Sequence, residues 1–332
     1  MHPRRIYCEL LPYDDLTRPR VLGLLARYRL SLVLAVRPWQ LDALTDVSRA
    51  LADHGVPLSL WPMLADEDGR WVNVDNAPSF SDLVRRACDR VGDPGPSEVL
   101  FDLEPPFDDV RGLTDSDAGG GHALRALRRM GVAAARARFA KGAGQLHGLV
   151  RELDAREVAT SSAVWPLAAL DDAQDPAWQT LLGTPVDGLG LGRVSVMMYT
   201  SIIQGWSRGA LSRADVLALL HGCCLRARKR WGDGGGVSLG AVGVGAFSDE
   251  PIYRDPGELA ADVGVALAAG ATDLTLFDLT GVLAREPAEA WLDAFVSDEP
   301  SAFAPTSRAR LARHAAKLST RAVGLASRLL SR

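Results

Sequence analysis

In the segment VLFDLEPP, residues 99–106, a short apolar run leads into two carboxylates and is then stopped by two prolines. Alternate side chains of a strand face opposite sides, so Asp102 and Glu104 share one face while Phe101 and Leu103 point the other way. Proline cannot donate a hydrogen bond to a sheet, so the ladder ends here. The segment predicts a buried strand that carries two acids at its carboxyl end.

Runs of this kind recur along the whole chain, and helical patterns separate them. Residues 41–51 and 216–224 have apolar side chains at spacings of three and four, which is typical of helices packed on a sheet. Strand and helix in alternation predict parallel strands and an α/β fold, a (β/α)8 TIM barrel. The alternative is an open doubly wound sheet, which the absence of a Gly-rich phosphate loop after the first run disfavours. The strand-length runs are 5–11, 31–37, 57–64, 97–104, 158–166, 193–200, 237–246 and 273–280.

Composition narrows the class of protein. The chain has 332 residues, 47% of them hydrophobic, and a net charge of -4, which leaves no basic footprint for nucleic acid. Its four cysteines lack zinc-site spacing and are expected to be reduced. The N-terminus enters a strand without the apolar segment of a signal peptide, so we expect a cytoplasmic protein, or a secreted one if a leader has been removed.

The barrel is expected to occupy residues 1–298, with a helical extension over 299–332. That extension has no acid after residue 300 and repeats Arg and Leu at helical spacing, which predicts a basic amphipathic helix. We expect it to pack on the outer helices of the barrel; the alternative is weak contact with an anionic membrane surface or a partner. The Ala-rich stretch 119–157 predicts one long crossover helix.

Active sites of β/α barrels lie on the loops at the carboxyl ends of the strands. The chemistry-bearing residues at the predicted strand ends, or in the tryptophan-flanked loop 61–73 that follows the third strand, are Glu9, Arg37, Trp61, Trp71, Asp102, Glu104, Trp165, Tyr199 and Asp278. Aromatic rings and planar polar groups of this kind suit a carbohydrate cleft.

Paired acids suit cleavage of an acetal. One protonated carboxylic acid must reach the leaving oxygen, and a neighbouring carboxylate raises the pKa of that acid toward neutral pH. Glu104 is the expected acid and Asp102 its neighbour. If a second protein carboxylate takes part, Glu9 and Asp278 are the candidates. Arg37 either holds substrate or pairs with Glu9.

Two strand ends resemble glycoside hydrolase family 18, the chitinase-like barrels. Asp102-Leu103-Glu104 is similar to the last part of the family signature Asp-x-x-Asp-x-Asp-x-Glu, and Met197-Met198-Tyr199 is similar to its Met-x-Tyr on the sixth strand. The resemblance implies that Glu104 protonates the leaving oxygen, that Asp102 orients an acetamido group of the substrate, and that Tyr199 hydrogen-bonds that group. It also implies a glycan substrate containing N-acetylhexosamine and no cofactor.

The sequence departs from the family at four positions. Ser97 and Leu100 stand where the signature has its two earlier acids, Thr200 stands where an acid or amide is usual, and Phe277 aligns with a tryptophan. These departures keep open a glycan-binding barrel with weak or no catalytic activity.

A metal-dependent sugar isomerase is the remaining alternative. Glu9, Asp102, Glu104 and Asp278 are oxygen ligands that a hard cation could use. The six histidines lie outside the predicted strand ends, at positions 2, 54, 122, 147, 221 and 314. We therefore expect no transition-metal site.

Overall fold

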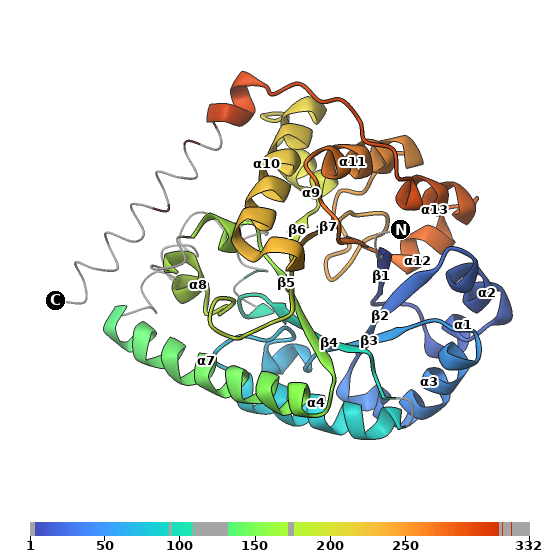
Figure 1. The fold of residues 1–332 in the computed structure, drawn as a ribbon, viewed down its shortest axis with the longest axis vertical. Helices are drawn as coiled ribbons and strands as arrows, with labels where there is room; N and C mark the ends of the chain where they lie inside the picture. The colour runs from blue at the N-terminus through green and yellow to red at the C-terminus, as the bar shows by residue number, and fades with distance from the viewer. Residues whose placement is uncertain are drawn as a thin grey trace.

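The computed structural model describes residues 4–92, 95–107, 110, 132–171, 176–311, 314 and 320. These residues form a closed barrel in which the strands follow one another in chain order from β1 to β8 (Figure 1). Every neighbouring pair is parallel, and β1 closes the barrel on β8. The predicted (β/α)8 barrel is confirmed, and the open sheet is wrong. The strands are β1 Arg4–Cys8, β2 Leu30–Val36, β3 Leu58–Pro62, β4 Glu98–Leu103, β5 Ala159–Val164, β6 Arg193–Met198, β7 Gly235–Leu239 and β8 Leu274–Leu276.

Helices surround the barrel and bury the outward faces of the strands (Figure 1). The helices are α1 Tyr13–Leu16, α2 Pro19–Arg27, α3 Leu44–Asp53, α4 Ala77–Val91, α7 Val132–Ala155, α8 Ala177–Leu182, α9 Thr200–Trp206, α10 Arg213–Trp231, α11 Pro256–Ala268, α12 Leu279–Ala284 and α13 Ala288–Val296. Helix α7 covers most of the predicted crossover helix, whose residues 119–131 lie outside the described part of the chain. Among the described residues, no helix is both long and apolar enough to cross a membrane.

Strand β4 shows the predicted alternation. Val99, Phe101 and Leu103 join the core between barrel and helices, whereas Leu100 joins a separate cluster inside the barrel. Asp102 is on the same face as Leu100, so its carboxyl points into the barrel at the carboxyl end of β4. The position of the acids therefore follows directly from strand periodicity.

The amino end of the barrel also contains buried charges, but these are paired. Arg5 on β1 donates to both oxygens of Glu98, at 3.0 and 3.2 Å, and to both oxygens of Asp273, at 2.6 and 2.7 Å. Arg193 adds a second cation 3.3 Å from Glu98. This network fills the amino end of the barrel, and Glu104 lies at the carboxyl end.

The chain after α13 lies along α11 and α10 (Figure 1). Ser301 N donates to the carbonyl of Gly264 at 3.0 Å, the Phe303 ring stacks on His221, and Thr306 Oγ1 donates to Asp215 at 2.6 Å. These contacts hold the first part of the extension against the barrel. Most of the predicted basic helix lies outside the described residues.

Candidate active site

Asp102 lies inside the barrel mouth and is 2% exposed. Its Oδ2 accepts a hydrogen bond from Trp61 Nε1 at 3.0 Å. Trp61 comes from β3, the neighbouring strand, and its indole is buried. Oδ1 receives no hydrogen bond from an N–H or O–H donor of the described residues. Trp61 is thus a fixed partner of the acid as well as part of the wall.

Glu104 follows β4 by one residue and is 9% exposed. Trp165, which directly follows β5, donates from Nε1 to Glu104 Oε2 at 2.6 Å. Burial raises the pKa of Glu104 to about 7, although the bond from Trp165 lowers it. Glu104 is therefore partly protonated near neutral pH, as a general acid requires.

The two carboxyls act on each other. Burial raises the pKa of Asp102 well above its usual value, and the charge of Glu104 raises it further. The proximity of the two carboxyls raises the pKa of Asp102, and on the Glu104 side the neighbouring Asp102 lowers the pKa. Because it is costly to ionise both carboxyls in an apolar pocket, the two acids titrate as a pair.

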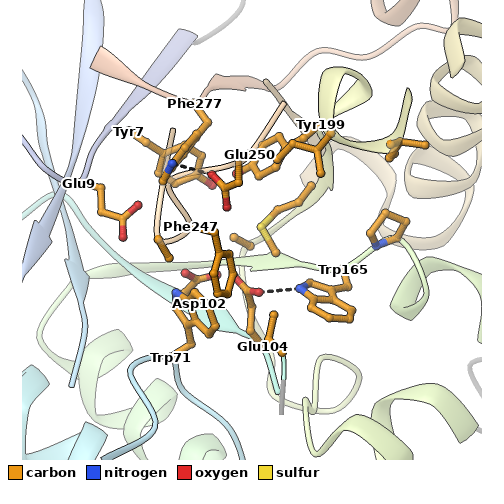
Figure 2. A pocket seen from close by; sticks show the side chains of 18 of the residues that line it. Tyr7, Glu9, Trp71, Asp102, Glu104, Trp165, Tyr199, Phe247, Glu250 and Phe277 are labelled. Carbon is orange, nitrogen blue, oxygen red and sulfur yellow. Dashed lines mark hydrogen bonds between the residues drawn. The ribbon is translucent and has the colours of Figure 1, made fainter. Parts of the chain in front are cut away.

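A continuous row of aromatic rings forms the floor beside the acids. Tyr7 contacts Trp61 at a centroid distance of 5.0 Å and Phe277 at 6.0 Å, and Phe277 contacts Tyr199 at 5.4 Å. A side chain at Gly240 would come within 2.8 Å of the Tyr199 ring, so glycine leaves the space that this ring occupies. Figure 2 shows Tyr199, Phe277 and Tyr7 on the side of the pocket opposite Glu104.

Thr200, one of the departures from the family pattern, anchors the end of β6. Its Oγ1 donates to Asp262 Oδ2 at 2.5 Å and accepts from Arg213 at 2.8 Å. Tyr253 donates to the same Asp262 carboxylate. Thr200 is fully buried and takes part in this network behind the pocket, so the residue beside Tyr199 is held by α10 and α11.

The loop after β3 brings Trp71 to the pocket. Val72 bridges to Leu103 in parallel fashion, and its N–H donates to the carbonyl of Asp102 at 3.1 Å. Trp71 then contacts Phe107 at a centroid distance of 5.4 Å, and Phe107 stacks on Phe247 at 5.6 Å. Figure 2 shows Phe247 in front of Asp102 and Glu104. Aromatic side chains from three loops thus partly cover the acids.

Glu9 lines the same pocket, but its partner is not Arg37. Arg70 donates to Glu9 Oε1 at 2.5 Å. Arg37 pairs with Asp66 at 2.5 Å and lies outside the pocket lining. The expected Arg37–Glu9 pair is wrong, because the loop after β3 places Asp66 and Arg70 between the two side chains, with Asp66 on Arg37 and Arg70 on Glu9. Burial raises the pKa of Glu9, and Arg70 opposes that rise.

Asp278 does not line the pocket. Its Oδ1 accepts a hydrogen bond from Gly281 N at 3.0 Å, so the side chain caps the N-terminus of α12. It is fully buried, and burial raises its pKa to about 6. The placement of Asp278 beside the substrate is therefore wrong, because the strand ends before it and the residue begins a helix.

Glu250 is a carboxyl of this pocket that the sequence analysis missed. It lies in the long loop after β7 and accepts a hydrogen bond from Gly245 N at 2.6 Å (Figure 2). Burial raises its pKa to about 7. The Asp-Glu pair at 249–250 was the local signal that could have found it, because it lies three and four residues past the predicted strand 237–246, on the loop at the carboxyl end of that strand.

The resulting cavity has a volume of about 260 Å³. Such a volume lies near the lower end of small-ligand sites, roughly 300–1,000 Å³, and suits a small part of a ligand. Of the predicted site residues, those that line it are Glu9, Trp61, Trp71, Asp102, Glu104, Trp165 and Tyr199. Within the described part of the chain, no three His, Cys, Asp or Glu side chains are arranged to hold a metal ion.

Comparison with solved structures shows the same barrel in glycoside hydrolases. The glycoside hydrolase domain of PgaB (BpsB) from Bordetella bronchiseptica has a TM-score of 0.53 at 12% identity, over 89% of this chain and 99% of that one. A GH18 chitinase from Pseudoalteromonas aurantia has a TM-score of 0.51 at 12% identity, over 88% and 99%. The spore cortex-lytic enzyme SleL of Bacillus megaterium has a TM-score of 0.52 at 11% identity, over 90% and 75%.

Sequence comparisons add no relative. No family model matches the chain, and no curated protein matches it. Epimerase and aldolase barrels are also similar, but with lower TM-scores, such as 0.45 for a D-psicose 3-epimerase. The resemblance suggested by Asp102-Leu103-Glu104 and Met197-Met198-Tyr199 is confirmed at the level of fold: this chain is a β/α barrel similar to chitinase-like glycoside hydrolases.

Proposed function

We propose that this protein hydrolyses a glycan that contains N-acetylhexosamine, with Glu104 as general acid. One observation carries the proposal. Glu104, whose pKa is raised to about 7, and its buried neighbour Asp102 line one cavity together with aromatic rings that include Tyr199. A carboxylic acid that stays protonated near neutral pH can protonate a leaving oxygen.

The reaction that suits these residues is substrate-assisted. Glu104 gives its proton to the glycosidic oxygen as the bond from that oxygen to the anomeric carbon breaks, and the acetamido oxygen of the substrate attacks the same carbon. Asp102 and Tyr199 orient the acetamido group, as the resemblance implies. Glu104, now ionised, then removes a proton from the water that opens the cyclic intermediate. The bond from Trp165 stabilises this ionised form.

Glycan binding without efficient turnover is the second candidate function. Leu100 occupies the layer of the barrel interior directly beneath Asp102, where the family signature carries an acid. Without that acid, Asp102 lacks one neighbour able to hold or return a proton. A barrel of this kind would keep the cleft and its aromatic walls but turn over slowly.

Hydrolysis of chitin and peptidoglycan fragments by the unmodified protein and by Glu104→Gln tests the proposal. We expect the unmodified protein to cleave a fragment, and Glu104→Gln to lose about 10²–10⁴-fold in kcat while still binding it. Glu299→Gln is the control, because it makes the same change at an exposed residue outside the cavity. Binding without cleavage by the unmodified protein would favour the second candidate. Hydrolysis unaffected by Glu104→Gln would contradict the proposal.

A further inference from the structure

Trp39 stands out on the surface next to the cavity. It is 66% exposed, whereas Trp61 and Trp71 are buried. It lies in the 3₁₀ helix Pro38–Ala43, which follows β2 and therefore sits at the same end of the barrel as Glu104. A large aromatic ring left in water costs free energy, and such rings are typical of binding surfaces.

We propose that Trp39 is the platform of a second sugar-binding subsite, which holds a ring of the same glycan outside the catalytic cavity. This inference rests on the proposed function, since it assumes a glycan in the cavity. Trp39 lines a surface depression of about 450 Å³, and Glu9 lines both this depression and the cavity. Glu9, which is buried and bonded to Arg70, forms part of the wall between the two hollows, so a glycan that extends over this wall from the mouth of the cavity would reach Trp39.

The platform is held in place from behind. The guanidinium of Arg37 lies over the Trp39 ring, 4.7 Å from its centroid, which is a cation–π contact. Arg37 is fixed in turn by Asp66, and Asp66 also accepts from Arg70 at 3.0 Å. Arg70 continues the row to Glu9. The ion pairs thus connect Trp39 to the wall of the cavity and order it before any ligand arrives, which lowers the entropic cost of binding.

The chemistry of the depression favours a sugar. A pyranose ring has an apolar face that can stack on an indole and hydroxyl groups that can bond with its surroundings. Around Trp39 the lining supplies the groups that such hydroxyls need: carboxylates of Asp66 and Glu67, the guanidinium of Arg70 and the amide of Gln40. The cavity itself is small, so a longer glycan must extend beyond it.

Binding of N-acetylglucosamine oligomers to the Glu104→Gln protein tests the subsite, because this background binds without cleaving. We expect Trp39→Ala to weaken binding of the hexasaccharide about tenfold, which is about 1.4 kcal/mol, and to leave binding of the disaccharide unchanged. Trp39→Phe should keep most of the hexasaccharide affinity. Leu225→Ala on α10 is the control, since Leu225 is also exposed but lies far from the carboxyl ends of the strands.

The other outcomes contradict either the subsite alone or the proposed substrate as well. Equal hexasaccharide affinity with and without Trp39 overturns the subsite and leaves the proposed function intact. Equal weakening for both oligomers, with an unchanged melting curve, also overturns it, because Trp39 would then act on the cavity. If neither oligomer binds to Glu104→Gln or to the unmodified protein, the proposed N-acetylhexosamine substrate fails and the subsite with it.

Discussion

Strand β4 carries buried acid at both of its ends, and the two ends differ in how that acid is neutralised. At the amino end, Glu98 meets the cations Arg5 and Arg193. At the carboxyl end, Asp102 and Glu104 meet each other and two indole N–H groups. At the amino end the buried charges have partners of opposite sign, whereas at the carboxyl end the two acids are costly to ionise, so burial raises their pKa. The buried charges of the amino end are thus compensated, whereas the carboxyl end holds the acids that are available for chemistry.

The largest effect on activity is expected from a change at Asp102. In Asp102→Asn we expect kcat on the cleaved glycan to fall about 10²–10⁴-fold, because Glu104 then lacks the acid with which it titrates as a pair. The free energy of unfolding should stay the same or rise, since the change removes a buried acid that has no cation partner. Steady-state kinetics and urea unfolding measure the two effects. A large loss of stability with normal kcat would contradict the assignment.

The matching change at the amino end is Arg5→Met. It leaves Glu98 and Asp273 buried beside only the half-exposed Arg193. We expect the free energy of unfolding to fall by about 3–5 kcal/mol, because removing Arg5 leaves buried carboxylates without their main partner. KM of the remaining folded protein should not change. Unfolding curves followed by circular dichroism test this, and stability equal to that of the unmodified protein would show that the network contributes little.

The pH dependence of activity tests the protonation state of Glu104 at the carboxyl end of β4. Burial raises the pKa of Glu104 to about 7, and the proposed reaction uses its protonated form. The rate constant kcat/KM should therefore fall as pH rises through about 7, by a factor approaching ten per pH unit. Initial rates between pH 5 and pH 9 measure this. In the same range Glu299→Gln should keep the profile of the unmodified protein, and a flat profile for the unmodified protein would exclude Glu104 as the acid.

The smallest expected effect concerns Trp165. Its bond to Glu104 lowers the pKa of that carboxyl by stabilising the ionised form. Trp165→Phe removes the donor and keeps an aromatic ring, so the descending limb of the pH profile should move to higher pH by a fraction of a unit. The position of that limb is the measurement. A shift to lower pH would mean that Trp165 stabilises the protonated form instead.

The barrel and the core of the candidate site could be predicted from the amino-acid sequence alone. Strand periodicity placed Asp102 on the inward face together with Leu100, and strand order brought Glu104, Trp165 and Tyr199 to one mouth. These features depend on local pattern and on the geometry of parallel strands, which chain sequence contains directly.

The partners that the loops supply could not be predicted from the sequence, because they depend on long-range packing. Arg70 took the place expected of Arg37 beside Glu9, Glu250 entered the cavity from a long loop, and Asp278 turned away to cap a helix. The reason is physical: a loop's path depends on distant contacts, such as the bridge from Val72 to Leu103, which no periodicity within the loop records.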